Sequence, residues 1–261
     1  YENFDYKKEE IAKKYDTWQK DFEVWASEEK ELKALWDIMM SGNPLDVNET
    51  FPEYTTEDKL ATRAASGAML QVLEKMYPGL VGGSADLEGP NSCKIKSSTY
   101  YAPDNRGGRN IHFGIREFAM TAISNGMSLH GGLKPFCATF LVFADYMKPA
   151  IRLSSLMKLP MIYIFTHDSI YVGEDGPTHQ PIETITSLRT IPGVQVLRPG
   201  DAQETELAWL MASETKDHPV CLLFSRQNLV VYEKDDPDWR NTVKCGAYIV
   251  QKGADKPDVT I

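Results

Sequence analysis

The apolar and polar positions of the chain change periodicity several times along its length. Between residues 1 and 41 bulky apolar residues recur at roughly helical spacing, with no Pro or Gly before Gly42, which predicts one or two amphipathic helices. Residues 41–52 hold turn residues without periodicity and are interpreted as a linker. The stripe of the first segment is expected to pack on a neighbouring domain and consists of Trp18, Phe22, Trp25, Leu32, Leu35, Trp36 and Met39.

From residue 55 onward, short apolar runs alternate with longer segments of helical period. A helix is predicted to begin at Thr55, because Asp58 three residues later completes a capping-box pattern. Further helices are predicted at 115–129, from the end of the strand at 134–140 to about residue 157, from 182 onward and after Asp201. The predicted strands are 80–83, 110–114, 134–140, 161–165, 193–197, 220–224 and 246–250. This alternation predicts an α/β fold with a doubly wound, mostly parallel sheet and helices on both faces, preceded by the helical segment.

Composition and charge restrict the class of protein. The 261 residues are 42% hydrophobic, which is enough for one large or two small domains. A formal net charge of −9 argues against nucleic acid or a membrane as partner. No apolar run has the length of a transmembrane helix, and no signal peptide opens the chain. The four cysteines have no close-paired spacing, so a reducing, intracellular compartment is expected.

Polar side chains follow the predicted strands, most densely after the strand at 161–165. The next residues include His167, Asp168, Glu174, Asp175 and His179, among glycines and prolines that give the loop an unusual backbone shape. Because the carboxyl ends of parallel strands meet at one edge of a sheet, we expect this loop to lie near Asp86 and Arg226. A merely polar surface loop is the alternative.

Other candidate residues have two readings each. Glu117 lies in the first turn of a predicted helix, where an acid complements the helix dipole or acts in a site. Phe140, Phe143 and Tyr146 are spaced three apart, as expected for core packing or for one wall of a pocket. Arg63 lies off the apolar stripe of its helix and is either solvated or part of a site.

Several kinds of chemistry lack their sequence signature. We find no P-loop, no Gly-x-Gly-x-x-Gly turn and no Gly-x-Ser-x-Gly elbow. The imidazoles and carboxylates of 167–179 have no defensible metal-ligand spacing, so no metal site is assigned. Two imidazoles, several carboxylates and two arginines at a sheet edge suit a polyhydroxylated, anionic small molecule. The residues alone indicate a small-molecule domain of an enzyme and leave its reaction open.

Motifs in a fixed order make the chain similar to the transketolase family. Residues 173–181 read Gly-Glu-Asp-Gly-Pro-Thr-His-Gln-Pro and are preceded by Thr166-His-Asp-Ser169. The resemblance covers 55–230 and extends to 61–63 (Ala-Thr-Arg), 82–87 (Gly-Gly-Ser-Ala-Asp-Leu), 113–118 (Phe-Gly-Ile-Arg-Glu-Phe), 138–143 (Ala-Thr-Phe-Leu-Val-Phe), 197–199 (Leu-Arg-Pro) and 225–229 (Ser-Arg-Gln-Asn-Leu).

The resemblance implies a thiamine diphosphate cofactor, of which this segment would bind the aminopyrimidine half. Glu117 matches the glutamate that hydrogen-bonds the aminopyrimidine ring and favours its imino form. Phe140, Phe143 and Tyr146 match the aromatic pocket around that ring, and Asp86 matches a cofactor-side acid. The cofactor carries the covalent chemistry, and the protein positions and polarises it.

The resemblance also implies phosphosugar substrates. His167, Asp175 and His179 match residues that contact the hydroxyls and carbonyl of the sugar, so Glu117, His167 and His179 are the expected catalytic residues. Arg63 and Arg226 match phosphate-binding arginines. The family usually has a phosphate-contacting serine at the place of Pro90, which has no donor, and Ser92 is the candidate replacement.

A three-part organisation follows from the resemblance. Residues 1–52 are expected to be a helical linker from a diphosphate-binding domain, 53–235 the pyrimidine-binding domain, and 236–261 a linker into a further domain. The diphosphate-binding domain, with a Gly-Asp-Gly stretch and Mg²⁺ or Ca²⁺ ligands, is expected before Tyr1. Because the family's active site lies between two subunits, the chain alone is expected to be inactive and the full enzyme to be a homodimer.

The resulting hypothesis is the central domain of a cytoplasmic transketolase of the pentose phosphate pathway. This transferase moves a two-carbon ketol unit from a ketose phosphate to an aldose phosphate. Two alternatives remain open: a dihydroxyacetone synthase, which uses formaldehyde as acceptor, and a non-catalytic homologue acting in assembly.

Overall fold

The computed structural model describes residues 1–47 and 49–254, and a six-stranded sheet forms its centre. The strand order is β3-β2-β4-β5-β7-β6, and each neighbouring pair is parallel. The strands are β2 (Leu80–Ser84), β3 (Asn110–His112), β4 (Lys134–Phe140), β5 (Ile162–Thr166), β6 (Gln195–Leu197) and β7 (Val220–Leu223). The parallel α/β sheet expected from the alternation of segments is confirmed.

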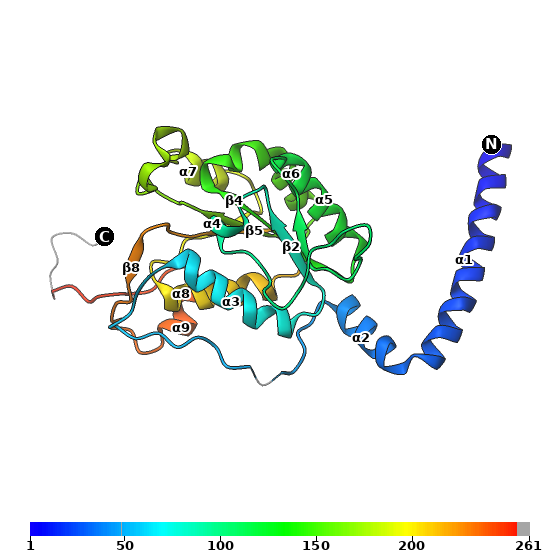
Figure 1. The fold of residues 1–261 in the computed structure, drawn as a ribbon, viewed down its shortest axis with the longest axis horizontal. Helices are drawn as coiled ribbons and strands as arrows, with labels where there is room; N and C mark the ends of the chain where they lie inside the picture. The colour runs from blue at the N-terminus through cyan, green and yellow to red at the C-terminus, as the bar shows by residue number, and fades with distance from the viewer. Residues whose placement is uncertain (48, 255–261) are drawn as a thin grey trace.

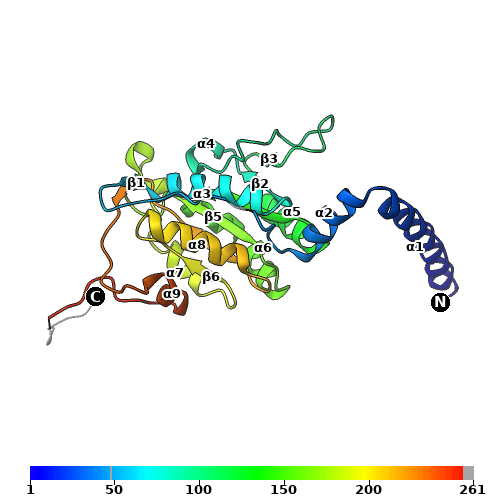
Figure 2. The ribbon, with the colours of Figure 1, turned by 90° about the horizontal axis from the view of Figure 1, so that it is seen from below.

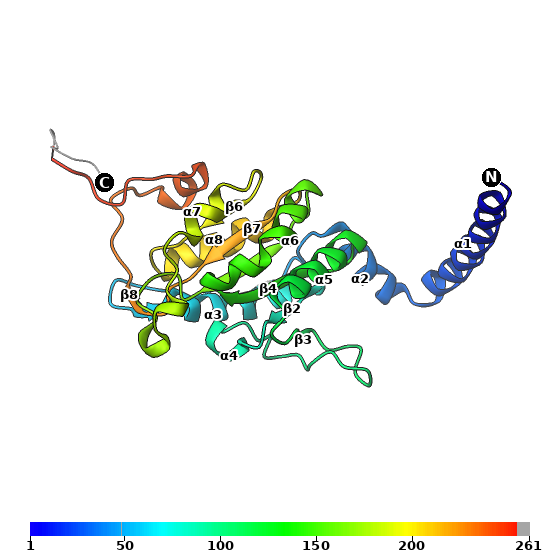
Figure 3. The same ribbon diagram turned by 90° about the horizontal axis from the view of Figure 1, so that it is seen from above.

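Helices cover both faces of this sheet (Figure 1). On one face lie α3 (Thr62–Met76) and α8 (Ala202–Glu214), which are in front of the sheet in Figure 2. On the other lie α5 (Glu117–His130) and α6 (Ala144–Leu156), which are in front of it in Figure 3. Alternate residues of β5 therefore enter two cores: Ile162 and Ile164 join the core on the α3 side, and Tyr163 and Phe165 join the core on the α5 side.

Smaller elements decorate the sheet. The strands β1 (Lys59–Ala61) and β8 (Asn228–Val230) form a separate antiparallel pair. Short α-helices are α4 (Glu88–Asn91), α7 (Thr184–Arg189) and α9 (Trp239–Thr242), and short 3₁₀ helices are Leu141–Phe143, Gly173–Asp175, Pro177–His179 and Val243–Cys245.

Two helices precede this body, as the helical spacing predicted. They are α1 (Glu2–Glu28) and α2 (Lys30–Ser41), and α1 extends away from the sheet (Figure 1). Neither helix buries a residue fully, and their aromatic rings contact one another instead, with ring centroids 5.3 Å apart for Trp18 and Phe22 and 5.7 Å for Phe22 and Trp36. The packing of this stripe on another domain stays a prediction, as do the domain boundaries.

No helix in the described part of the chain combines the length and the apolar character needed to cross a membrane.

Two elements predicted from the sequence are wrong. The helix expected at Thr55 begins at Thr62, because the Asp58 carboxylate accepts hydrogen bonds from the Thr55 amide (2.7 Å) and hydroxyl (3.1 Å) and closes a turn. The three residues after that turn pair with β8 as a strand. The strand expected at 246–250 is absent from the described residues. This segment is held by backbone bonds from the Asp235 amide to the Val250 carbonyl (2.9 Å) and from the Gly246 amide to the Val243 carbonyl (2.9 Å), and by the contact of Tyr248 with Glu204.

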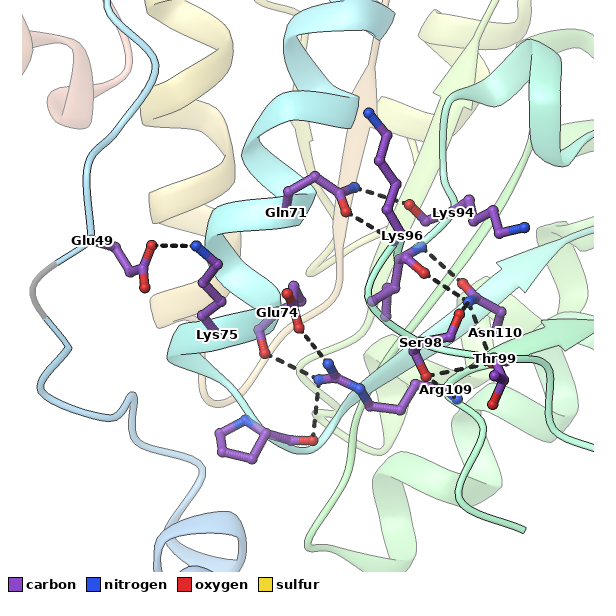
Figure 4. Close-up of polar contacts among 12 residues, drawn as sticks. Glu49, Gln71, Glu74, Lys75, Lys94, Lys96, Ser98, Thr99, Arg109 and Asn110 are labelled. Carbon is purple, nitrogen blue, oxygen red and sulfur yellow. Dashed lines mark hydrogen bonds and ion pairs between the residues drawn. The ribbon is translucent and has the colours of Figure 1, made fainter. Parts of the chain in front are cut away.

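The segment between α4 and β3 is held against α3 by polar contacts (Figure 4). Arg109 contacts the Glu74 carboxylate and donates to the Glu74 carbonyl (3.0 Å). The Asn110 side chain accepts from the Ile95 amide (2.8 Å) and donates to the Ile95 carbonyl (2.9 Å), and Gln71 donates to the Lys94 carbonyl (2.9 Å). These contacts fix the end of the preceding loop, which carries Asn91 and Ser92.

The order of the strands creates a crevice at one edge of the sheet. After β2 the chain adds β3 on one side, and β4 then pairs with β2 on the other. In open α/β sheets, such a switch point leaves a crevice outside the carboxyl ends of the strands, where ligands bind. The residues that follow β2, β4, β5 and β7 meet in this region.

Candidate active site

Two cavities open at the carboxyl edge of the sheet, with volumes of about 480 and 510 Å³. The first, called the glutamate cavity, is lined by Ala85, Asp86, Leu87, Ile115, Glu117, Phe143 and Tyr146. The second, called the arginine cavity, is lined mainly by Arg63, Pro90, Ser92, Phe140, His167, Asp175 and Arg226. All ten site residues expected from the sequence except His179 line one of these cavities.

Glu117 and Asp86 are the two carboxylates among the described residues that line the glutamate cavity. Glu117 is the first residue of α5, so its side chain lies at the positive end of that helix. The described residues offer no hydrogen-bond partner to its carboxylate, while Phe143 and Tyr146 supply aromatic wall. A flat heteroaromatic ring would therefore find apolar surface and one carboxylate able to share a proton with a ring nitrogen.

His167 lies buried on the wall of the arginine cavity. Its ring stacks on Phe140 with centroids 3.7 Å apart, and its Nδ1 lies 2.8 Å from the Thr166 hydroxyl. Burial, and secondly the Arg63 charge, lowers the pKa of His167 to about 4, although the Asp175 charge partly offsets these effects. The imidazole is therefore neutral near pH 7 and suits hydrogen bonding to a hydroxyl.

Arg63 and Arg226 give the arginine cavity its positive charge. Burial, and secondly the neighbouring Arg226, lowers the pKa of Arg63. Arg63 donates from Nη1 to the Pro90 carbonyl (2.9 Å), and neither arginine has an ion-pair partner among the described residues. Two guanidinium groups that repel one another without a paired carboxylate are suited to bind a phosphate group.

His179 contacts one aromatic residue of each cavity. Its ring lies edge-on to Phe140 (6.0 Å between centroids) and to Phe143 (5.3 Å), and these two phenyl rings are stacked 6.0 Å apart. Phe140 thus lines the arginine cavity, whereas Phe143 and Tyr146 line the glutamate cavity. A ligand spanning both cavities would pass His179.

The backbone at the site adopts unusual conformations. Four described non-glycine residues have positive φ, and three of them belong to the site: Asp86 (62°), Ser92 (53°) and His167 (56°). Such backbone costs about 1–3 kcal/mol per residue and persists where the surroundings over-determine it, frequently at functional sites. This feature marks the same strand ends independently of side-chain chemistry.

Sequence reasoning missed two buried residues, Thr166 and Asn91, of which Thr166 contacts His167 directly and Asn91 contacts Thr166. Thr166, at the end of β5, donates to the side-chain carbonyl of Asn91 (2.6 Å), and the Asn91 amide donates to Ser84 (2.8 Å). Thr166 begins one recognised motif and Asn91 follows another, but the hydrogen bond between their side chains joins residues 75 positions apart. The signal available in the sequence was that both are polar residues in segments that follow predicted strands.

The described residues contain no group of three or more His, Cys, Asp or Glu side chains placed to hold a metal ion.

Comparisons with known proteins agree with this geometry. The sequence profile of the family described as "Transketolase, pyrimidine binding domain" matches residues 58–231. A transketolase of Treponema pallidum (strain Nichols) is 48% identical over 257 residues, which are 97% of this chain and 39% of that protein. The chain thus spans about two fifths of the length of such curated relatives.

Solved structures of transketolases share the fold. A transketolase from Leishmania mexicana superposes with a TM-score of 0.85 at 37% identity, over 92% of this chain and 36% of the other. A transketolase from Pichia stipitis, in a complex with sedoheptulose 7-phosphate, gives a TM-score of 0.80 at 37% identity, over 87% of this chain and 35% of the other. The chain therefore belongs to the transketolase family and comprises its pyrimidine-binding domain.

Proposed function

We propose that this chain forms the pyrimidine-binding half of a transketolase active site. The enzyme would transfer a two-carbon ketol unit from a ketose phosphate to an aldose phosphate with thiamine diphosphate as cofactor. The observation that carries this proposal is the pairing of two cavities. One has an aromatic wall and the Glu117 carboxylate at a helix start, and the other has His167 and two arginines that lack an ion-pair partner among the described residues.

The glutamate cavity has the chemistry to hold an aminopyrimidine ring. Phe143 and Tyr146 would contact the faces of the ring, and the Glu117 carboxylate would hydrogen-bond a ring nitrogen and favour the imino form. Asp86 also lines this cavity and would face the rest of the cofactor. The bound cofactor would supply the nucleophilic carbon that carries the two-carbon unit.

The arginine cavity suits a phosphosugar. His167, Asp175 and His179 would bind the hydroxyls and carbonyl near the cofactor, and Arg63 with Arg226 would bind the terminal phosphate. The sugar phosphate in the related Pichia stipitis structure supports this class of ligand. Ser92 lines the cavity beside Pro90 and is the candidate hydroxyl in place of the usual serine.

The outer surface of α5 and α6 supports assembly as a homodimer. Large apolar side chains on these neighbouring helices are exposed, namely Phe118, Ile123, Leu129, Leu153 and Leu156. An exposed apolar patch of this kind usually marks a protein interface. We propose that a second copy covers it and that a diphosphate-binding domain, with its Mg²⁺ or Ca²⁺, completes the site. A cytoplasmic location and a place in the pentose phosphate pathway belong to the same proposal.

The acceptor distinguishes transketolase from dihydroxyacetone synthase. The test uses the enzyme assembled from this chain and a diphosphate-binding domain, with xylulose 5-phosphate as donor and either ribose 5-phosphate or formaldehyde as acceptor. We expect transfer to ribose 5-phosphate and none from the chain alone. Transfer to formaldehyde only would favour the synthase. The one observation that supports the synthase is Pro90, which has no hydrogen-bond donor at the place of the usual phosphate-contacting serine. No transfer to either acceptor would support the non-catalytic alternative.

Gly173 provides a test of the phosphate site. A Cβ at Gly173 would lie 2.9 Å from Cζ and 3.0 Å from Nη2 of Arg226, so Gly173→Ala should displace this guanidinium. We expect KM for the phosphosugar to rise about 10-fold, as for the loss of one charge-assisted hydrogen bond, with a smaller change in kcat. Steady-state kinetics of the assembled enzyme measure this.

Gly176→Ala is the matched control. Gly176 has the same φ of 81°, but its added Cβ would meet no atom within 4 Å. Both substitutions therefore place a side chain at positive φ, and only one of them disturbs Arg226. Equal increases in KM for the two variants would show that strain, and not Arg226, controls phosphosugar binding.

A further inference from the structure

One segment of the candidate active site makes few hydrogen bonds to the rest of the protein. Residues 168–181, called the His179 loop, follow β5 and carry Asp175 and His179. Among the described residues, only Arg198 hydrogen-bonds to this loop from outside it. The other hydrogen bonds of the loop join two of its own residues, namely Tyr171 to Ser169, Gln180 to Ile170, His179 to Gly176, Gln180 to Pro177 and Thr178 to His179.

Arg198 holds the first residue of the loop at two points. Its Nε donates to Oδ2 of Asp168 (2.7 Å), and its Nη2 donates to the Asp168 carbonyl (3.4 Å). The direction of both bonds is unambiguous, because a guanidinium only donates and carboxylate and carbonyl oxygens only accept. The second carboxylate oxygen, Oδ1, is buried and has no hydrogen-bond partner in the described part of the chain. The Asp168 carboxylate therefore has a single partner there, which is Arg198.

Burial makes Asp168 dependent on this partner. Asp168 is only 6% exposed, so water cannot replace Arg198 while the loop keeps its place. A buried carboxylate without a counter-ion is strongly unfavourable. If Arg198 were removed, movement of the loop away from the sheet would return the carboxylate to water. The ion pair thus favours the observed position of the loop over a displaced one.

Arg198 itself lies on a well-fixed part of the fold. It directly follows β6 and precedes Pro199, which is buried and restricts the residue before it to an extended backbone. In the sheet β7 lies between β5 and β6, so the Arg198 side chain reaches across the end of β7 to Asp168. The motif Leu-Arg-Pro at 197–199 thereby contacts the motif Thr-His-Asp-Ser at 166–169. Neither Arg198 nor Asp168 has a role in the proposed function.

We propose that Arg198 is a positioning residue, which holds the His179 loop at the carboxyl edge of the sheet through its ion pair with Asp168. Arg198 lines neither cavity, so it acts through the loop. Asp175 lines the arginine cavity, and His179 contacts Phe140 and Phe143. The inference rests on the proposed function, in which Asp175 and His179 contact the phosphosugar.

The position of His179 is directly measurable by NMR of the chain. Its ring lies edge-on to two phenyl rings, at 6.0 and 5.3 Å between centroids, and their ring currents displace its proton resonances from those of a free histidine. The chain contains five histidines, so the ring signals are few, and the signals lost in His179→Gln identify the residue. We expect Arg198→Met to move the His179 signals toward free-histidine values. Unchanged signals in this variant would overturn the inference.

Substitutions of Asp168 test whether Arg198 acts through this carboxylate. Asp168→Leu removes the side-chain acceptor and should displace the His179 signals as Arg198→Met does. Asp168→Asn keeps an acceptor oxygen for Nε of Arg198, so its signals should stay closer to those of the wild type. Equal displacement in Asp168→Asn and Asp168→Leu, or wild-type signals in Asp168→Leu, would contradict the role of this hydrogen bond.

Arg240→Met is the matched control. Arg240 pairs with the Glu206 carboxylate at 3.0 and 3.1 Å and lines neither cavity. The two pairs are similarly buried, since the side chains of Arg240 and Glu206 are 48% and 10% exposed and those of Arg198 and Asp168 are 41% and 6% exposed. Loss of an ion pair at Arg240 should leave the His179 signals unchanged. Their displacement in this variant too would attribute the effect to general loosening and contradict a specific role of Arg198.

Kinetics of the assembled enzyme separate this inference from the proposed function. Misplacement of a catalytic group by about 1 Å can cost about 100-fold in rate, so Arg198→Met should lower kcat by about that factor. KM for the phosphosugar should change less, because Arg63 and Arg226 lie outside the loop. Displaced His179 signals with wild-type kcat would refute the substrate contacts of Asp175 and His179, while the positioning by Arg198 stands. Undisplaced signals would refute that positioning whatever the activity.

Discussion

Replacing Glu117 with glutamine is expected to lower the kcat of ketol transfer by about 10²–10⁴-fold, the usual contribution of a positioned acid or base. Glutamine keeps the size of the side chain and can still hydrogen-bond, but its amide cannot share a proton with the aminopyrimidine. Among the described residues that line the glutamate cavity, only Asp86 also carries a carboxylate, and the proposed function assigns it to another part of the cofactor. Steady-state turnover of the assembled enzyme at saturating thiamine diphosphate measures the loss.

The control for this variant is Glu214→Gln, at an exposed position at the end of α8. It makes the same chemical change far from both cavities and should keep wild-type turnover. Wild-type turnover of Glu117→Gln itself would remove the glutamate from the mechanism and favour the non-catalytic alternative.

The second large effect concerns stability. Asp201 is fully buried, caps α8 by accepting from the Glu204 amide (2.8 Å), and pairs with Nζ of the buried Lys234 (2.5 Å). Asp201→Ala removes the cap and leaves a buried charge without its counter-ion, which typically costs about 3–5 kcal/mol. We expect the free energy of unfolding of the chain to fall by that amount, as measured by urea denaturation with tryptophan fluorescence.

Asp104→Ala serves as control, because Asp104 is exposed and its side chain makes no hydrogen bond to the described residues. Its effect should stay within about 0.5 kcal/mol. Lys234→Met removes the cation and leaves the cap in place, so a large effect there would assign most of the loss to the buried pair. Equal stabilities of Asp201→Ala and the wild type would contradict the importance of this pair.

The same sequence pattern succeeded at one helix and failed at another. A polar residue followed three positions later by an acid predicted a helix start at Thr55, with Asp58, and at Asp201, with Glu204. Only Asp201 caps a helix. After the turn at Thr55, β1 pairs with β8, which lies far away in the sequence. The next residue, Thr62, donates its amide to Ser225, 163 residues later in the chain. Local patterns do not contain such long-range pairing.

The site was predictable in its location and only partly in its arrangement. Parallel strands bring their carboxyl ends together, so the polar residues after β2, β5 and β7 could be expected to meet. The resemblance named Phe140 with Phe143 and Tyr146 as one pocket, whereas the structure places Phe140 against His167 in the other cavity.

Positive φ at His167, and the hydrogen bonds from Asn91 and Thr166, depend on three-dimensional contacts that no spacing reveals. His167 lies in a loop that the density of glycine and proline marked as unusual, yet the residue in the left-handed region is the histidine itself. The role of each residue in the site stays a prediction until the variants are measured.

The most direct measurement of the central claim is the exchange rate of the C2 proton of thiamine diphosphate bound to the assembled enzyme. The account predicts fast exchange in the wild type and exchange slower by about 100-fold or more in Glu117→Gln, because on the proposed function the carboxylate would activate the aminopyrimidine that would remove this proton. Equal exchange rates in the two proteins, at full cofactor occupancy, would contradict it.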